Sequence, residues 1–292
     1  MRKAELALCL VGLLLGGSLV VVAGAFPVTV IDDRGEAIVI EALPERIITV
    51  GALYAEIILG LGAGDRLIAV AESPENPAGT EGLPTVGSTF APNVELIVGF
   101  GPDLVLGASD WGGERGALEA AGIPVLTTPV LASIPDIFLS IREVGTAIGK
   151  QEEADRLIGR MAERIVEAET QALGRPKIRA AFLYASTPDA PPYAAGAGAI
   201  ENELILRAGG ENVFADIEGF PQVGFEEILA RDPEVIFTAP SQIENLTGHP
   251  LLQGVAAVRG GRVLGIGASQ VTSTRVVEAL LEVIRALHGF EP

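Results

Sequence analysis

A helical pattern over residues 133–173 interrupts an otherwise regular alternation of short strands and helices. After Pro135 this stretch has no further proline, and its apolar residues recur at spacings of three and four. Because Gly145 and Gly149 can kink a helix, the pattern predicts one short helix followed by one long helix. A helix of about 25 residues would be nearly 40 Å long, which exceeds what one small lobe needs. The interruption therefore predicts two lobes joined by a single long α-helix.

Strands and helices alternate on both sides of this linker. Before it we expect strands at 47–50, 67–71, 104–106 and 125–127, with helices at 53–61, 93–100 and 114–121. After it we expect strands at 180–184, 235–238 and 263–266, with helices at 200–208, 225–230 and 272–288. The strands are apolar on both faces, which is typical of parallel sheets covered by helices.

Residues 26–40 alternate apolar and polar side chains around a Gly-containing turn at 32–35, which predicts an N-terminal β-hairpin. The expected fold class is therefore α/β. It consists of two Rossmann-like lobes of parallel-rich sheet flanked by helices, joined by a single long α-helix, with the β-hairpin leading the first lobe.

An internal duplication supports the two lobes. Residues 93–106 align without a gap on residues 224–237, and in both copies a Glu, Glu95 or Glu226, precedes a Pro by seven positions. A second match pairs the segment that begins at Glu56 with the segment that begins at Glu203. Two matches in the same order predict lobes related by pseudo-symmetry.

The first 25 residues have the pattern of an export signal. Arg2 and Lys3 precede an apolar run at 6–22, and Ala-Gly-Ala at 23–25 suits a signal peptidase. An uncleaved anchor is the alternative, because the run is nearly long enough to span a bilayer. Either one predicts an extracytoplasmic protein. The expected division is 1–25 for the signal peptide or anchor, 26–133 for the N-terminal lobe, 134–174 for the linking helices and 175–292 for the C-terminal lobe.

Composition excludes several classes of function. The 38 Asp and Glu residues outnumber the 20 Lys and Arg, so the net charge of −18 disfavours nucleic acid. The chain has two His and one Cys, Cys9, which lies in the leader, so neither a thiolate nor a polyhistidine metal site is expected. The G-x-S-x-G, G-x-G-x-x-G and P-loop patterns are absent from the sequence. We therefore expect no cofactor, no bound metal and no enzymatic activity.

Several stretches together resemble a known family. They include Pro44-Glu-Arg-Ile-Ile-Thr-Val, Leu61-Gly-Ala-Gly-Asp-Arg, Pro92-Asn-Val-Glu-Leu-Ile, Pro192-Tyr-Ala-Ala-Gly and Asp232-Pro-Glu-Val-Ile. From about residue 26 to its end, the chain resembles the class III periplasmic binding proteins of ABC importers, which deliver vitamin B12, ferric siderophores and haem. The resemblance implies ligand capture between two lobes that rotate little, because one continuous helix joins them.

The resemblance also implies a docking role for Glu95 and Glu226, since members of the family dock onto permease arginines through one Glu on each lobe. The alternative is that each Glu only complements its own helix dipole, which typically contributes about 0.3–1 kcal/mol. Glu227 is an adjacent carboxylate that could be mistaken for the docking residue.

Ligand contacts are expected in loops that follow strand ends, where open α/β sheets bind ligands. The aromatic candidates in these loops are Tyr54, Phe90 and Trp111. The resemblance adds Tyr193 and Phe220, which match positions where relatives place aromatic ligand contacts, and the plausible cleft arginines are Arg115 and Arg275. Each aromatic could instead be a packing residue. Arg275 could equally cap a helix or pair with Glu278 at i+3.

Departures from the family bear on the ligand. Corrinoid-binding relatives usually carry an aromatic in the loop after the second strand, where this chain has Glu-Ser-Pro-Glu-Asn-Pro at 72–77. Siderophore-binding relatives often place several arginines in the cleft, where this chain offers Arg115 and Arg275. Haem-binding relatives often supply Tyr or His as an iron ligand, for which Tyr54 and Tyr193 are candidates. Molybdate is a further possible ligand, because the Ser- and Thr-rich loops do not exclude an oxyanion.

The scarcity of arginines favours a neutral metal chelate such as a corrinoid (cobalamin) over a ferric siderophore. The expected function is the substrate-binding component of an ABC importer, with the membrane permease and its ATPase as partner. An exported enzyme or adhesin is the alternative from a different class, but it would not explain the matched lobes.

Overall fold

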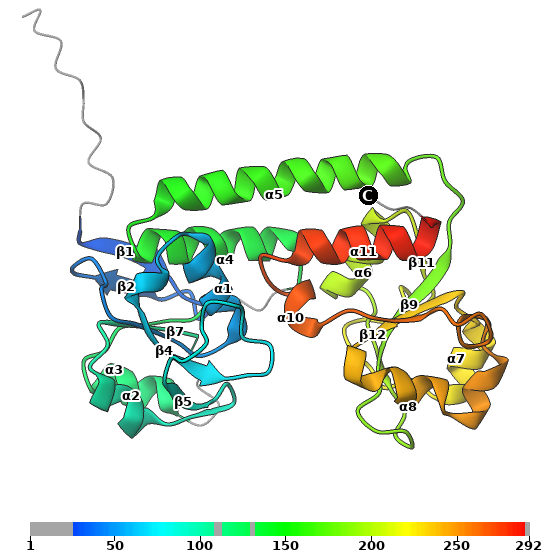
Figure 1. Cartoon of the computed structure of the whole chain (residues 1–292), viewed down its shortest axis with the longest axis horizontal. Coiled ribbons are helices and arrows are strands. Elements are labelled where there is room, and N and C mark those ends of the chain that lie inside the picture. Colours follow the sequence, from blue (N-terminus) through cyan, green and yellow to red (C-terminus); the bar gives the residue numbers. More distant parts are fainter. Residues whose placement is uncertain (1–25, 108–112, 129–131, 290–292) are drawn as a thin grey trace, which may run out of the picture.

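The structure is a computed structural model that describes residues 26–107, 113–128 and 132–289. Two α/β lobes lie side by side beneath one long helix (Figure 1). The predicted fold class is confirmed by this arrangement. Among the described residues, no helix is long and apolar enough to cross a bilayer.

The N-terminal lobe contains a six-stranded sheet in the order β6-β5-β4-β3-β7-β8. Neighbouring strands are parallel, except that β6 runs antiparallel to β5. The strands are β3 (Ile47–Thr49), β4 (Leu67–Glu72), β5 (Thr85–Ser88), β6 (Ala91–Pro92), β7 (Leu104–Leu106) and β8 (Val125–Leu126). The α-helices are α1 (Ala52–Gly60), α2 (Val94–Phe100) and α3 (Glu114–Ala120). The predicted hairpin forms from β1 (Val28–Ile31) and β2 (Ala37–Ile40).

The C-terminal lobe contains a sheet in the order β10-β9-β12-β13, with β11 also paired to β9. Its strands are β9 (Arg179–Tyr184), β10 (Tyr193–Ala194), β11 (Glu211–Asn212), β12 (Val235–Thr238) and β13 (Val263–Gly265). Its α-helices are α6 (Ile200–Arg207), α7 (Phe225–Arg231), α8 (Ile243–Thr247), α9 (Ala256–Arg259), α10 (Ala268–Val271) and α11 (Val276–His288). The closing helix thus begins at Val276 and not at residue 272, because residues 272–275 form a turn between α10 and α11.

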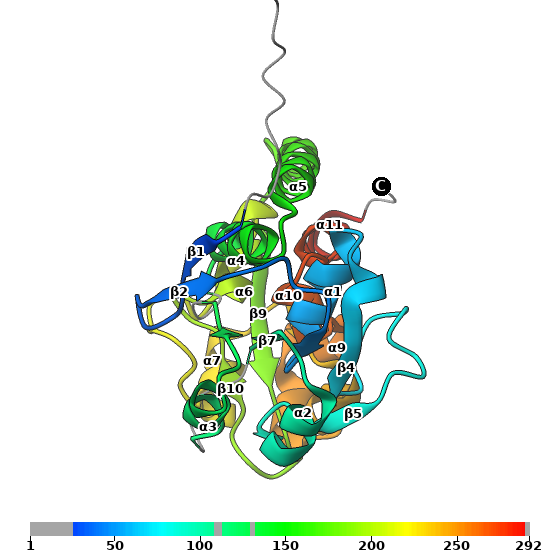
Figure 2. The same cartoon turned by 90° about the vertical axis from the view of Figure 1, so that its left-hand side faces the viewer.

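The linker consists of α4 (Ile134–Ala147) and α5 (Gln151–Ala172), as the sequence predicted. Gly149 has a left-handed φ of 68°, which a helix interior does not allow, so the chain turns there. As a result α4 packs beside α1 and β1, whereas α5 runs back over both α4 and α11 (Figures 1 and 2). Along the polypeptide chain, the described part of the linker therefore passes from one lobe to the other through α5.

Both sheets share one apolar core beneath α5. Ile47 of β3 and Phe237 of β12 belong to the same buried cluster, together with Ile165 of α5. The next residue of β3, Ile48, faces a separate cluster inside the N-terminal lobe, and Ile236 of β12 faces one inside the C-terminal lobe. Because successive strand residues face opposite sides of a sheet, each sheet packs on the common core with one face. This continuity holds the lobes close together.

Candidate functional site

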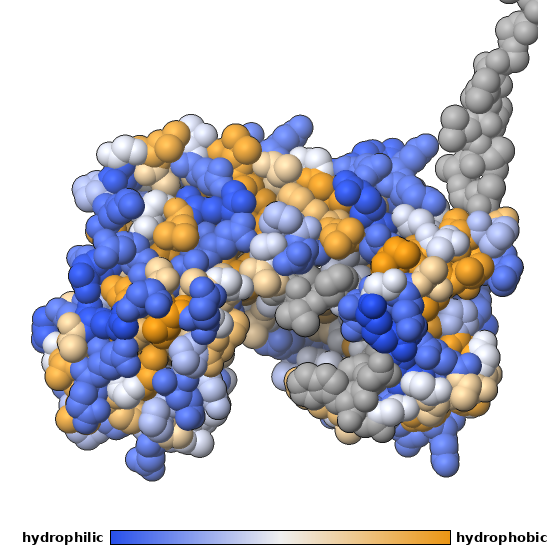
Figure 3. Space-filling view, turned by 180° about the vertical axis from the view of Figure 1, so that it is seen from behind, coloured by the Kyte–Doolittle hydropathy of each residue, from blue (hydrophilic) through white to orange (hydrophobic). Residues whose placement is uncertain are grey.

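The carboxyl ends of the two sheets face each other across the space between the lobes. Glu75 lies in the loop that follows β4, and its Oε2 accepts a hydrogen bond of 3.2 Å from the backbone N–H of Ser269, in α10 after β13. The charge of Glu75 also contributes to a raised pKa of Tyr184 at the end of β9. The surface is deeply hollowed between the lobes (Figure 3). This cleft is where open α/β sheets place ligands.

Three of the predicted aromatic contacts are exposed at these strand ends. Phe90, between β5 and β6, is 83% exposed, while Tyr193 and Phe220 are 45% and 46% exposed. Tyr193 pairs with Tyr184 in the sheet, and the Phe220 ring lies 6.2 Å from the Tyr184 ring. Phe220 and Tyr193 therefore share one edge of the C-terminal sheet, and apolar rings exposed in this way can stack on a large flat ligand.

A buried polar pair lies behind these aromatics. The Tyr184 hydroxyl donates a 2.7 Å hydrogen bond to Oε1 of Glu201, in the first turn of α6. The other carboxylate oxygen of Glu201 is buried without a hydrogen-bond partner among the described residues. Burial raises the pKa of Glu201, and burial together with the Glu201 charge raises the pKa of Tyr184. Tyr184 is thus held as a neutral phenol.

Tyr54 lies inside the N-terminal lobe and not on the cleft surface. Its side chain is 7% exposed, and its hydroxyl accepts a 2.9 Å hydrogen bond from the backbone N–H of Thr128 and lies 3.1 Å from the Thr128 hydroxyl. Burial also raises the pKa of Tyr54, so an ionised phenolate that could ligate iron is disfavoured. The predicted ligand contact for Tyr54 is therefore corrected to a packing role.

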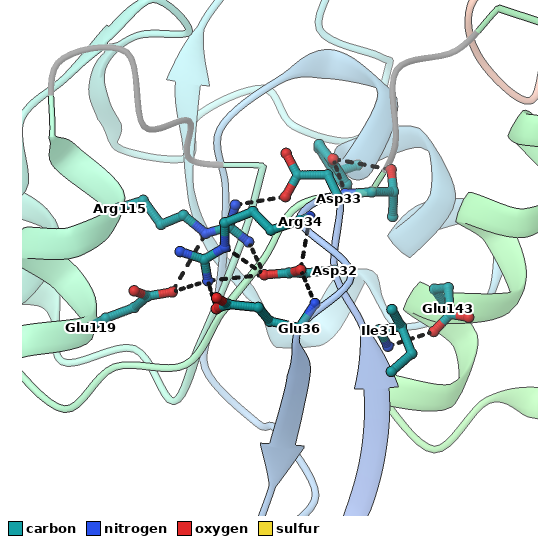
Figure 4. A network of polar contacts seen from close by, with 10 residues as sticks. Ile31, Asp32, Asp33, Arg34, Glu36, Arg115, Glu119 and Glu143 are labelled. Atoms are coloured by element: carbon teal, nitrogen blue, oxygen red, sulfur yellow. Dashed lines mark hydrogen bonds and ion pairs between the residues drawn. The ribbon is translucent and has the colours of Figure 1, made fainter.

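Arg115 is also buried, at 1% exposure. Its guanidinium lies 2.8 Å from Asp32 Oδ2 and 2.6 Å from Asp33 Oδ1, both in the hairpin turn (Figure 4). Arg34 joins the same cluster by pairing with Asp32 and Glu119. Burial alone would raise the pKa of Asp32, but hydrogen bonds from Glu36 and Arg34 and the Arg115 charge lower it. Arg115 thus docks the hairpin onto α3, which corrects its predicted role as a ligand contact.

Arg275 is 44% exposed in its side chain, but it is engaged by a residue of the other lobe. Its Nη2 lies 2.6 Å from Oε1 of Glu56 in α1 and donates a 2.8 Å hydrogen bond to the Ser269 hydroxyl. The predicted alternative, a pair with Glu278, is not what the structure shows, because Glu278 pairs with Arg164 of α5. Trp111, the remaining ligand candidate, lies outside the described residues.

The two predicted docking glutamates are exposed in the first turns of matching helices. Glu95 lies in α2 of the N-terminal lobe and Glu226 in α7 of the C-terminal lobe, and both helices lie below α5 in Figure 1. Glu227 is exposed too, but its carboxylate lies 2.9 Å from Arg231 one turn later. This ion pair distinguishes Glu227 from Glu226, which makes no ion pair within the described part of the chain.

Sequence reasoning overlooked the cleft residues Glu75, Tyr184 and Glu201. Tyr184 ends β9, so the rule that led to the other loop candidates would also have selected it. Glu75 lies in the 72–77 segment, where the sequence indicated a missing aromatic but no contact with the opposite lobe. Glu201 carried no such signal, because an acidic residue near a helix N-terminus is common.

Two α/β lobes face each other across a cleft at the carboxyl ends of their strands, and one long helix spans both. This arrangement is that of a two-lobed ligand-binding protein. Comparison with known families agrees, since the model of the periplasmic binding protein family matches residues 47–269. The chain belongs to this family, and its predicted role as a substrate-binding component of ABC-type import is confirmed at that level.

Two curated relatives illustrate the similarity. The chain is 27% identical to an uncharacterized ABC transporter substrate-binding lipoprotein, YvrC, of Bacillus subtilis, over 90% of this chain and 86% of the relative. It is also 27% identical to a cobalamin-binding protein of Halobacterium salinarum, over 91% of this chain and 76% of the relative.

Solved structures with the same fold carry names that refer to other ligands. The periplasmic heme-binding protein RhuT from Roseiflexus sp. RS-1 has a TM-score of 0.77 at 26% identity, covering 84% of this chain and 98% of that protein. An ABC-type Fe3+-hydroxamate transport protein from Saccharomonospora viridis also has a TM-score of 0.77 at 26% identity, covering 91% and 100%. The family is therefore shown, while its members differ in ligand.

Proposed function

We propose that this protein is exported, captures a corrinoid such as cobalamin between its lobes, and delivers it to a membrane permease that docks on Glu95 and Glu226. The choice of ligand rests on one observation: both arginines that were expected in the cleft are already paired with carboxylates. Arg115 is buried among carboxylates, and Arg275 is paired with Glu56. The cleft therefore offers neither of them to an anionic ferric siderophore.

The charge of the cleft supports the same choice. Glu75 reaches across it, and Glu201 lies behind the Tyr184 ring. Carboxylates near a strongly anionic chelate would repel it, whereas they tolerate a neutral ligand that presents amide N–H donors. Phe90, Tyr193 and Phe220 would contact the faces of the ligand. A relative that matches 91% of this chain is named as a cobalamin-binding protein, which agrees with this proposal.

Haem is the second candidate ligand, since a structural relative is named as a heme-binding protein. A haem iron needs a protein side chain as its axial ligand. Of the two predicted candidates, Tyr54 is buried and hydrogen-bonded, which leaves the half-exposed Tyr193. Mutation of Tyr193 to Phe separates the two ligands, because it removes an iron ligand but retains the ring that a corrinoid would contact.

Calorimetric titration of the mature protein with cyanocobalamin, haemin, a ferric hydroxamate and molybdate tests the ligand. We expect saturable binding of cyanocobalamin, retained in Tyr193→Phe and weakened in Phe220→Ala. Binding of the ferric hydroxamate alone would contradict the corrinoid proposal. Failure of all four ligands to bind would contradict capture of this class of ligand.

Uptake into vesicles that contain the cognate permease tests docking. The double variant Glu95→Arg/Glu226→Arg should lose transport and keep its affinity for the ligand, because both side chains are exposed and neither is a candidate ligand contact. Glu227→Arg is the matched control, since it introduces the same charge one residue away and should transport normally. A loss of ligand affinity in the double variant would contradict the docking assignment.

A further inference from the structure

The duplicated glutamates Glu56 and Glu203 both contact the opposite lobe. They occupy matching positions in the internal repeat, in the first long helix of each lobe, α1 and α6. Each carboxylate is directed at the beginning of a helix in the other lobe. Neither residue belongs to the cleft aromatics or to the exposed docking pair.

Glu56 holds the start of α11. Its side chain is 4% exposed, its Oε1 lies 2.6 Å from Arg275 Nη2, and its Oε2 accepts a 3.3 Å hydrogen bond from the Thr274 hydroxyl. Thr274 and Arg275 immediately precede α11, which packs on α5 and α6 of the C-terminal half. A carboxylate of the N-terminal lobe is therefore buried against a helix start of the C-terminal lobe.

Glu203 makes the reciprocal contact. Its Oε2 accepts a 2.9 Å hydrogen bond from the backbone N–H of Ile134, the first residue of α4, which packs on α1 and β1 of the N-terminal lobe. Its Oε1 is held 2.6 Å from Arg207 of the same helix, and Arg207 in turn pairs with Glu169 of α5. The Glu203 carboxylate is thus oriented by Arg207, which Glu169 in turn holds in place.

The two contacts are arranged around the middle of the molecule. In Figure 1, α4 and α11 both lie under α5 with their N-terminal ends turned toward the junction of the lobes. Helix N-termini present unpaired backbone N–H groups and a partial positive charge, which carboxylates stabilise. Because each contact joins the two lobes, an increase in the distance between the lobes would break both of them.

We propose that Glu56 and Glu203 are reciprocal inter-lobe latches, which are positioning residues that set the distance between the two lobes before any ligand binds. A fixed distance between the lobes also fixes the spacing between Glu95 and Glu226. The latches would therefore present both residues to the permease at one spacing, an effect on transport that rests on the proposed function. Arg275 then acts in this latch and does not bind the ligand.

The distance between the lobes can be measured directly. Gly99 of α2 and Ala230 of α7 are exposed and equivalent in the repeat, and a Cβ atom added at Gly99 meets nothing within 4 Å. The one native cysteine is Cys9, so the mature chain 26–292 accepts cysteines at positions 99 and 230 for a pair of spin labels. Pulsed dipolar spectroscopy without ligand then reports the distribution of lobe distances.

Glu56→Leu/Glu203→Leu should broaden this distribution and move it to longer distances, with each single variant between the double variant and the parent. Glu203→Gln should restore the parent distribution, because its amide oxygen can still accept from the Ile134 N–H. Glu278→Gln is the control, since it removes the exposed 2.7 Å ion pair between α11 and α5 but no contact of a latch.

An unchanged distribution in the double variant would overturn the proposal, even if its melting temperature fell, because lost stability alone does not move the lobes. Should that variant fail to fold, Arg275→Leu breaks the Glu56 latch from its more exposed side and must give the same broadening. The measurement needs neither cobalamin nor a permease. A failure of the proposed function would therefore leave its outcome unaffected.

Discussion

The N-terminal lobe buries an arginine among carboxylates, whereas the C-terminal lobe buries a carboxylate against a tyrosine. Arg115 meets Asp32 and Asp33, so the buried charges compensate each other. Glu201 meets the Tyr184 hydroxyl, and its second oxygen has no hydrogen-bond partner among the described residues. Two lobes built from one repeat therefore differ in whether their buried charge is neutralised.

This difference distinguishes buried charges that stabilise the fold from a buried charge that lies beside the candidate binding site. A compensated cluster fastens the hairpin to its lobe. An uncompensated carboxylate costs folding free energy, and proteins often retain such groups beside binding sites. The Tyr184–Glu201 pair, which lies next to the exposed Phe220, fits the second description.

The largest expected effect comes from removing the compensation in the N-terminal lobe. Arg115→Met should lower the free energy of unfolding by about 3 kcal/mol, because the buried carboxylate of Asp32 loses its buried partner and keeps only the partly exposed Arg34 as a counter-charge. Urea unfolding at pH 7 measures this loss. The loss should shrink in acid, since the stability that Asp32 contributes is present above its unfolded pKa and disappears as the pH falls through its lowered folded pKa.

Arg142→Met is the control for this variant. Arg142 lies 3.6 Å from Asp155 with both side chains largely exposed, so its loss should cost about 0–1 kcal/mol. Equal losses in the two variants would show that burial does not distinguish these ion pairs.

An effect of opposite sign is expected in the C-terminal lobe. Glu201→Gln should stabilise the protein by about 1 kcal/mol at pH 8, because it removes a buried charge that lacks a full set of partners. Burial raises the folded pKa of Glu201 above 4.5, so the gain should fall as the pH drops through that raised value and vanish once Glu is protonated in both states.

Thermal unfolding of parent and variant from pH 8 to pH 4 measures this gain. Tyr184→Phe should have the reverse effect, since it removes the one donor to Glu201 Oε1 that the structure shows. A stabilising Tyr184→Phe, or a Glu201→Gln effect that does not change with pH, would contradict this account.

The smallest effect tests the caps of the duplicated helices. Asn93 caps α2 by accepting a 2.9 Å hydrogen bond from the Leu96 N–H, whereas the equivalent Gly224 of α7 has no side chain to do so. Asn93→Ala should cost about 1 kcal/mol, and Gly224→Asn should add a few tenths of a kcal/mol by chemical denaturation. If Gly224→Asn destabilised the protein, the two helix starts would not be equivalent.

Local patterns predicted most of the fold. Double-sided apolar runs indicated parallel strands, and the capping residue Asn93 indicated the start of α2. The closing helix was predicted to start too early. Thr274 and Arg275 are compatible with a helix by local preference, but contacts with Glu56 hold them in the turn before it.

The site was less predictable because each error involved a partner far away in sequence. Tyr54 was expected at the cleft, but its hydroxyl is satisfied by Thr128, in the loop after β8. Arg115 was expected to contact a ligand, but the hairpin carboxylates more than eighty positions earlier surround it. Phe90, Tyr193 and Phe220 stay candidates because their exposure agrees with the expected role.

The sequence by itself determined the two lobes, the long connecting helix and the repeat in which Glu95 matches Glu226, because periodicity and repetition can be read along the chain. Only the tertiary structure decided which charged residues are available. An arginine or glutamate has the same letter whether it is paired or exposed, and burial beside a distant partner determines its state. For Arg115, Arg275, Glu56 and Glu203, that partner lies in another segment or in the opposite lobe.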